Sequence, residues 1–112
     1  MARTTFTGPV VSLNGFIAGT GTAAITKVLT ATASLNFPSI SAASQSDLTI
    51  TVTGAAVGDE VIMSLPAAPA AGLVFNAFVS AADTVTIRAS NITASPVDAA
   101  AASYGVIVIN AA

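Results

Sequence analysis

The chain of 112 residues contains no cysteine, no histidine and no tryptophan. The absence of cysteine excludes disulfides and thiolate chemistry, so the fold does not rely on an oxidising compartment. The absence of histidine removes the commonest general base and the commonest ligand of transition metals. Aromatic residues make up only 5% of the chain, and Tyr104 is a candidate for the exposed platform of a sugar-binding module. A tyrosine in the core or in an interface is the commoner outcome.

Charge is also scarce. Charged residues make up 7% of the chain, against about 25% in ordinary soluble domains. The net charge is −2 and the three basic residues, Arg3, Lys27 and Arg88, lie far apart, which argues against nucleic acid as a partner. Because hydrophobic residues reach 54%, we infer that other protein covers much of the outer surface. The alternative is a stable monomer with a bland surface of Ser, Thr and Ala.

No stretch of the sequence predicts a membrane span or a secretory signal. Polar residues, Gly or Pro interrupt every candidate apolar run before it reaches 18 residues. The opening MARTTFTGPVVSLNG lacks the continuous apolar region of a signal peptide. We therefore expect synthesis in a cytoplasm, use without export, and no membrane partner.

The five carboxylates do not form a catalytic or ligand pattern. Asp59 and Glu60 are adjacent, so on a strand they point to opposite faces. Asp47, Asp59 and Asp83 each stand where a loop is expected to meet a strand, and there we expect them to accept hydrogen bonds from turn amides. Asp98 stands alone, and no histidine is present to activate any of the serines. We expect no enzyme, no cofactor and no metal site.

Residues 47–65 predict a β-hairpin. Apolar residues alternate with threonine in its first half, which gives one apolar face and one hydroxyl face. Glycines at 54 and 58 bracket a turn, and a second alternating run follows. The alternating residues are Leu48, Ile50 and Val52 against Thr49, Thr51 and Thr53, and then Val61, Met63 and Leu65 against Ile62 and Ser64.

Four further strands are expected over residues 25–37, 73–82, 84–92 and 103–112. All five prolines fall outside these strands, in agreement with the alternation. Residues 106–109 are apolar on both parities, so we expect the last strand to lie in the centre of a sheet, buried on both faces. Residues 98–103 are too few for an independent helix and are expected to form a turn. The fold class is all-β, a small antiparallel β-sandwich of jelly-roll-like type.

Residues 1–24 are expected to form an extended N-terminal arm on a body of residues 25–112. Turn-forming glycines and Pro9 break the arm, and apolar residues stand between the breaks. Phe6, Val10 and Val11 are expected to dock on a neighbouring subunit, whereas Phe16 and Ile17 are as readily expected to pack on their own domain. Interface candidates in the arm are Arg3, Phe6, Val10, Val11, Leu13, Phe16 and Ile17, and a possible subunit-contact face on the body holds Thr49, Thr51, Thr53 and Asn76.

Several motifs resemble a domain found in virion structural proteins of tailed bacteriophages. They read L-x-F-x-S-I-x-A, then L-T-x-x-V-x-G-A-x-V-G-D, then A-G-L-x-x-x-A-x-V-S-A-A-D-T-V-T-x-R, and they end in a strand rich in valine and isoleucine. These motifs lie within residues 35–109, about two thirds of the chain. The most specific pieces are AADTVTIRASN and GAAVGDEV, whereas the alanine-rich loop before the last strand departs from the pattern.

The resemblance implies a head decoration (cement) protein. Such a protein is typically a homotrimer that sits on the capsid surface over junctions between copies of the major capsid protein. Residues 2–17 would then reach across capsid subunits. The alternative is a head or tail fibre knob that binds a host receptor or glycan near the loops of residues 66–72 or 91–103. A bacterial surface or pilus subunit is a weaker alternative because no export signal is expected.

Overall fold

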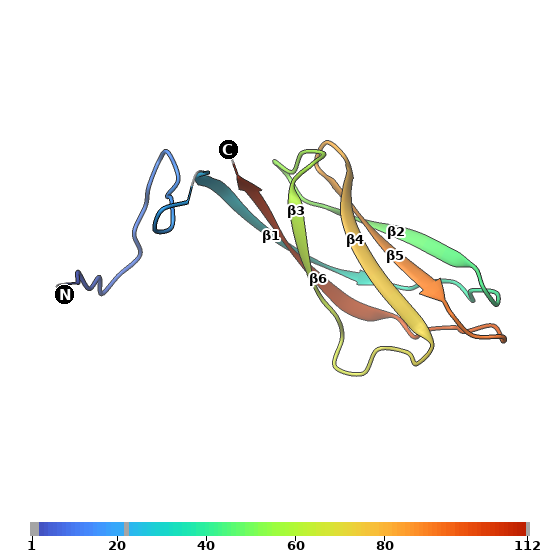
Figure 1. Ribbon diagram of the computed structural model, residues 1–112. Helices are drawn as coiled ribbons and strands as arrows, with labels where there is room; N and C mark the ends of the chain where they lie inside the picture. The colour runs from blue at the N-terminus through green and yellow to red at the C-terminus, as the bar shows by residue number, and fades with distance from the viewer. Residues whose placement is uncertain (1–2, 22, 112) are drawn as a thin grey trace.

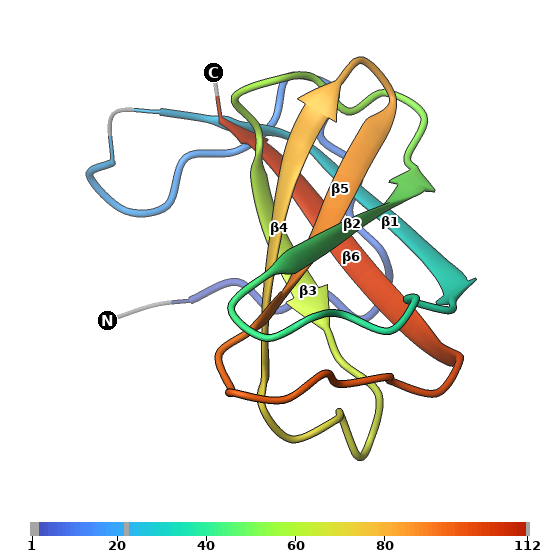
Figure 2. The same ribbon diagram turned by 90° about the vertical axis from the view of Figure 1, so that its right-hand side faces the viewer.

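Six strands form where apolar and polar side chains alternate. The computed structural model describes residues 3–21 and 23–111, and these residues contain no helix. The strands fold into two three-stranded antiparallel sheets that pack face to face (Figure 1; Figure 2). The all-β sandwich expected from the sequence is therefore confirmed. The strands are β1 (Ile25–Leu35), β2 (Gln45–Thr51), β3 (Glu60–Ser64), β4 (Leu73–Ala81), β5 (Thr84–Asn91) and β6 (Ala102–Ala111).

The strand orders are β1-β6-β3 in the first sheet and β2-β5-β4 in the second. The chain therefore changes sheets at every connection between strands except the tight turn between β4 and β5. In jelly rolls, too, the chain crosses repeatedly between two sheets, although a full jelly roll has eight strands. As a result, the central strands β5 and β6 are neighbours in sequence but lie in opposite layers.

The hairpin predicted over residues 47–65 is wrong. Its two halves are β2 and β3, but β2 pairs with β5 whereas β3 pairs with β6 in the opposite sheet. Val52 and Ala55 in the connection are buried, and the Val52 amide donates to the Asp83 carbonyl at 2.8 Å. The chain thus crosses the end of the core from one layer to the other. Alternation identifies a strand and its inner face, but it does not identify the strand with which it pairs.

The core contains one cluster of three aromatic rings. Phe37 follows β1, Phe75 lies on β4 and Tyr104 lies on β6, and their ring centroids are 5.7 to 6.0 Å apart. Phe37 meets both partners edge-on, an arrangement that aromatic pairs favour. The cluster therefore joins both sheets and the first connection. The side chains of Val85, Ile87 and Val108 extend the core and have no exposed surface.

The last strand is central, as expected, but only one of its faces is buried. Val106 and Val108 point into the core, whereas Ile107 on the opposite face is 39% exposed. In the single chain, the expectation that residues 106–109 are buried on both faces is therefore wrong. The physical reason is that each sheet has a single partner layer, so the outer face of β6 has no second layer over it.

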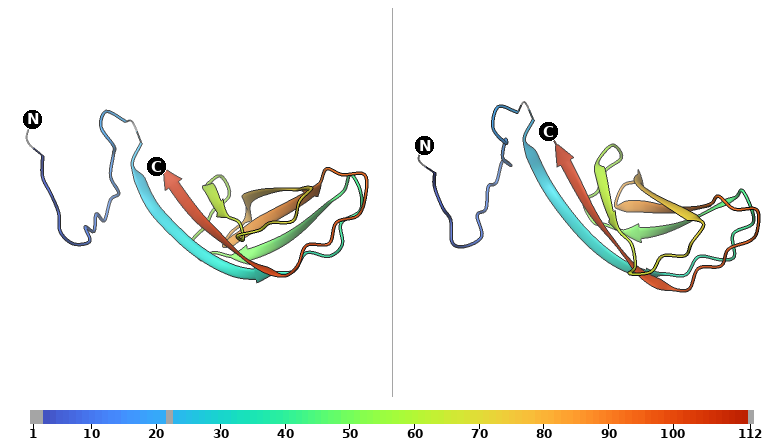
Figure 3. Two further views of the ribbon diagram at one scale, coloured as in Figure 1. Left: turned by 90° about the horizontal axis from the view of Figure 1, so that it is seen from below. Right: turned by 60° about the horizontal axis from the view of Figure 1, so that its bottom comes forward.

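The described residues before β1 project away from the sandwich as an irregular arm (Figure 1; Figure 3). Residues 3–21 form no strand, and their one bridge to the body joins Phe16 to Ile25. The radius of gyration is 17.6 Å, against about 13 Å for a compact chain of this length. The arm therefore adds length to the molecule without adding to its core.

Replacing Ile87 by alanine is expected to lower the free energy of unfolding by about 2 to 5 kcal/mol, because the side chain is fully buried between the sheets. The matched control is Ile92→Ala, since Ile92 is 72% exposed in the loop after β5. Urea titration followed by circular dichroism measures both values. Equal losses for the two variants would contradict the core described above.

Candidate functional site

A tight turn anchors the base of the arm to the first strand. The Phe16 amide donates to the Ile25 carbonyl at 3.2 Å, and the Ile25 amide donates to the Phe16 carbonyl at 2.9 Å. Before them, the Ser12 hydroxyl donates to the Gly15 carbonyl at 2.6 Å. Gly15 has a φ of +79°, and a Cβ there would overlap the Ile25 carbonyl. Only glycine fits this bend, so the direction in which the arm leaves the body is defined.

The arm residues singled out from the sequence do not come together as a cluster. Every one of them is exposed, and Leu13 at the turn is 93% exposed. Val10 and Phe16 do line one small hollow of about 190 Å³, together with Val28 of β1. Phe16 bonds to the body through its backbone, while its side chain stays 58% exposed.

The subunit-contact face expected on the body is a polar face. Thr49 and Thr51 lie on β2 and Asn76 lies on β4, on the outside of the β2-β5-β4 sheet, whereas Thr53 lies in the following turn. Between β2 and β4, Arg88 donates two hydrogen bonds to Asp47, both at 2.9 Å, and its guanidinium lies 5.1 Å from the centre of the Phe78 ring. The face satisfies its own charges and suits contact with water.

Asp47 therefore has a role other than the expected one. It lies within β2 and not at a loop junction, and its partner is the Arg88 side chain and not a turn amide. Hydrogen bonds from Arg88 lower the pKa of Asp47 and raise the pKa of Arg88. The misassignment arose because the strand begins at Gln45, three residues before its apolar alternation starts at Leu48.

Asp59 does accept hydrogen bonds from a turn, as expected. The Ala56 amide donates to it at 3.0 Å, the Asn110 side chain donates to it at 2.5 Å, and the Lys27 ammonium lies 3.9 Å away. The bond from Asn110 lowers the pKa of Asp59, and the Ala56 amide and Lys27 act in the same direction. Lys27 also donates to the Gly54 carbonyl at 2.6 Å. These contacts fasten the crossing between β2 and β3 to the first sheet.

Asp83 closes the same end of the sandwich. Its carboxylate accepts a hydrogen bond from the Gly54 amide at 2.8 Å, and its own amide donates to the Ala55 carbonyl at 2.9 Å. The residue has a φ of +60°, a conformation that aspartate tolerates in tight turns. Asp59 and Asp83 are thus structural, and neither faces a second carboxylate across a cleft.

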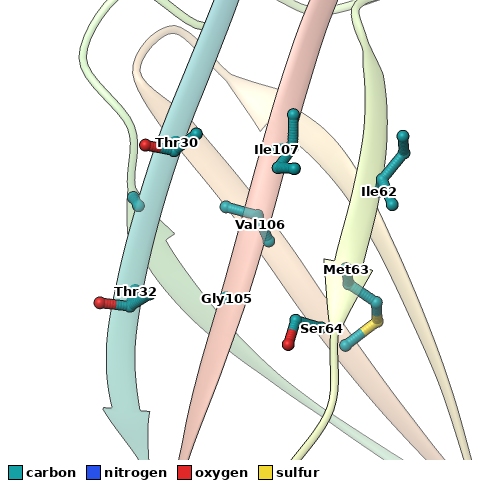
Figure 4. A pocket seen from close by; sticks show the side chains of 9 residues that line it. Thr30, Thr32, Ile62, Met63, Ser64, Gly105, Val106 and Ile107 are labelled. Atoms are coloured by element: carbon teal, nitrogen blue, oxygen red, sulfur yellow. The ribbon is translucent and has the colours of Figure 1, made fainter.

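The outer face of the β1-β6-β3 sheet is uncovered and carries apolar side chains among hydroxyls, with Glu60 as the charged residue near one end, and it was not predicted from the sequence. Ile62 on β3 and Ile107 on β6 lie side by side in register, with Thr30 on β1 completing the row. The next row holds Thr32, Gly105 and Ser64 (Figure 4). These two rows carry no charge. The sequence did hold a signal for this face. Residues 106–109 are apolar on both parities, so an apolar side chain such as Ile107 had to lie on the outer face of β6.

Gly105 makes a shallow hollow in the middle of this face. The hollow has a volume of about 470 Å³ and lies between the side chains of Ile62, Ile107 and Thr32 (Figure 4). A Cβ on Gly105 would lie 3.4 Å from the Thr32 methyl and 3.5 Å from the Ser64 Cβ, so a side chain there would fill the hollow. An apolar side chain from another segment fits the same space.

The two loops considered for a receptor site lie together at one end of the sandwich. The Ile92 amide donates to the Gly72 carbonyl at 3.1 Å, which ties residues 66–72 to residues 91–103. Asn91 is buried, and its side chain bonds to Ile40, Thr93 and Ser95 at 2.7 to 2.9 Å. The loops are thus held by their own hydrogen bonds.

Other chemistry is limited in the described part of the chain. Residues 3–21 and 23–111 contain no cluster of three side chains suited to a metal ion. No helix among them is long and apolar enough to span a membrane. No family model, curated protein or solved structure matches this chain. The arm and the outer face of the β1-β6-β3 sheet are therefore the two candidate interaction sites.

Substituting Gly15 by alanine is expected to release the base of the arm, because the new Cβ overlaps the Ile25 carbonyl and the φ becomes unfavourable. Amide hydrogen exchange at Phe16 and Ile25 should accelerate roughly tenfold while exchange in β5 stays unchanged. Gly8→Ala is the control, since a Cβ there meets nothing within 4 Å. Unchanged exchange in Gly15→Ala would contradict the defined bend.

Asp59→Asn is expected to flatten the dependence of stability on pH. The folded-state pKa of Asp59 lies below the ordinary value of 3.8, so its contribution is present above that pH and is lost as the pH falls through the folded-state pKa. Thermal unfolding between pH 6 and pH 2 measures the effect. The variant should melt below the wild type at pH 6 and approach it at pH 2, whereas Asp98→Asn should follow the wild type throughout. A constant gap between Asp59→Asn and the wild type would contradict the assignment.

Proposed function

We propose that the protein is a structural component of a tailed-bacteriophage virion, a decoration protein that binds the outer surface of the head where major capsid proteins meet. The observation that carries the proposal is the placement of apolar surface outside the core. Among the described residues, nine of the thirteen exposed large apolar side chains lie on the projecting arm or on the outer face of the β1-β6-β3 sheet. The opposite sheet face exposes Val74 among polar side chains and pairs Arg88 with Asp47. Apolar surfaces placed in this way suit a protein that binds over the surface of other proteins and is contacted by neighbouring copies.

Binding by such surfaces depends on area. Each Å² of apolar surface removed from water contributes about 25 cal/mol, so a contact of about 300 Å² contributes about 7 kcal/mol before the cost of ordering the arm. A shell repeats the same contact many times. If copies join as a homotrimer, their arms act together and the effective concentration of each arm rises.

The resemblance to phage virion domains supports the proposal through the fold. Its motif residues Leu35, Phe37 and Ile40 are buried core residues, and the GAAVGDEV motif forms the crossing between β2 and β3. The motifs therefore report how the sandwich is built. The surfaces described above support the role in a shell.

The proposal predicts that the purified protein binds capsids assembled without it, in hundreds of copies per particle, as counted by quantitative mass spectrometry. Removing residues 2–17 should weaken binding at least a hundredfold, since six of the apolar side chains in that segment are more than half exposed. The circular dichroism of the body should stay unchanged. Val57→Lys, in the loop before β3, is the control. Unchanged affinity after the deletion would exclude the arm, and a dozen or fewer copies per virion would favour a fibre knob.

A further inference from the structure

The outer face of the β1-β6-β3 sheet is too small to hold a second sandwich by itself. Its strands have 11, 10 and 5 residues, so at strand spacings of about 4.8 Å and rises of about 3.4 Å the whole face covers about 420 Å². A stable protein pair buries about 800 Å² on each partner. The part of the face that has all three strands measures about 14 by 17 Å. The face instead matches one extended segment of about six residues.

The chain itself contains an apolar extended segment without a partner. Residues 3–9 line neither of the hollows described above, and Phe6, their largest apolar side chain, is 68% exposed. Arg3 is the only charged residue in this segment and stands three residues before Phe6, and the two rows of the face around Gly105 carry no charge. No charged side chain therefore has to be buried when Phe6 enters the hollow. Segment and face are matched in chemistry.

The two surfaces do not meet within one chain. The bend at Gly15, fixed by its contact with Ile25, sends residues 3–11 away from their own sheet (Figure 3). The arm meets the body at the start of β1, through the Phe16–Ile25 bridge and the hollow that Val10 lines with Val28. The remainder of the face, from Thr30 to the Gly105 hollow, is left open. This open part of the face begins on β1, next to the place where the chain's own arm leaves the sheet.

We propose that the face around Gly105 receives the arm of a second copy of this chain, with Phe6 of that copy in the hollow. From Phe16 to Phe6 the arm spans ten residues, a reach of about 30 Å when extended, which is enough to lie across a neighbour's sheet. Thr32 and Ser64 border the hollow with small side chains, and Ile62 and Ile107 form its apolar wall. With Phe6 held by the second copy, the exposed side chains of Leu13 and Ile17 nearer the base remain available to a capsid. The exchange rests on the proposed decoration role for its setting on a shell, whereas the contact itself needs only the protein.

The contact is tested on the full chain in solution, without capsids. Sedimentation velocity over a range of concentrations should show self-association, and Ile62→Lys should weaken it at least tenfold. Val57→Lys should behave as the wild type, because Val57 is 69% exposed but lies off the face, and Ile62 is 57% exposed on it. Phe6→Ser should weaken association as Ile62→Lys does, and it lies outside the sandwich, so it leaves folding intact. The matched control is Phe16→Ser at the base of the arm, which should associate as the wild type does.

Cross-linking identifies the occupant of the face. The chain has no native cysteine, so Phe6→Cys in one population and Ile107→Cys in a second, size-tagged population give a clean background. A short bismaleimide should join the two populations, and Val57→Cys in place of Ile107→Cys should not be joined. A wild type that stays monomeric, association that resists both Ile62→Lys and Phe6→Ser, or equal cross-linking to Val57→Cys would each overturn the inference.

The same experiments separate this inference from the proposed function. If arm exchange occurs in solution but capsids are not bound, the decoration role fails and the contact stands. If capsids are bound equally by the wild type and Ile62→Lys and no self-association occurs, the contact fails and the decoration role stands.

Discussion

The packing of three aromatic rings is the interaction on which the rest of the structure depends. Phe75 lies on β4 in one sheet, whereas Tyr104 lies on β6 in the other sheet and Phe37 follows β1 of that same sheet. Each ring packs against the other two. A chain without disulfides, and with no metal-ligand cluster in its described part, has little else to hold two thin sheets in one relative position. Burial raises the pKa of Tyr104, which marks how closely the cluster excludes water. The crossings at both ends are then tied by hydrogen bonds of Asp59, Asp83 and Asn91.

The strands could be predicted from the sequence, but their partners could not. Alternation in β1 and β2 assigns inner and outer side chains correctly, since it reflects the local geometry of a strand. Pairing depends on contacts between segments far apart in sequence, and so the glycines at 54 and 58 predicted a hairpin where the chain crosses between layers. The candidate site shows the same limit. The arm was predicted from its own composition, whereas the apolar face needs three strands to be placed side by side before Thr30, Ile107 and Ile62 form one row.

The two outer faces of the sandwich differ because of a few residues. On β5, Arg88 finds Asp47 on one side and lies over Phe78 below it, so an outer face with two charges is neutral and hydrogen-bonded. On β6, the equivalent central positions hold Gly105 and Ile107, whose side chains have no group that can hydrogen-bond to water. The two ion pairs of the described residues lie at different places: Arg88 and Asp47 on the outer face of the β2-β5-β4 sheet, and Lys27 and Asp59 at the end of the sandwich where β2 crosses to β3. The centre of the β1-β6-β3 outer face is therefore left without charge.

The bend at Gly15 has a consequence for symmetry. A contact in which an arm of one molecule meets a different surface on the next is heterologous, and such contacts close into rings only when the rotation between neighbours divides a full turn; otherwise they run on as open filaments. If arms are exchanged as proposed, the joint where Gly15 meets Ile25 helps to set this rotation, since everything before that joint moves with it. The backbone angles at Gly15 would then contribute to how many molecules complete a closed ring.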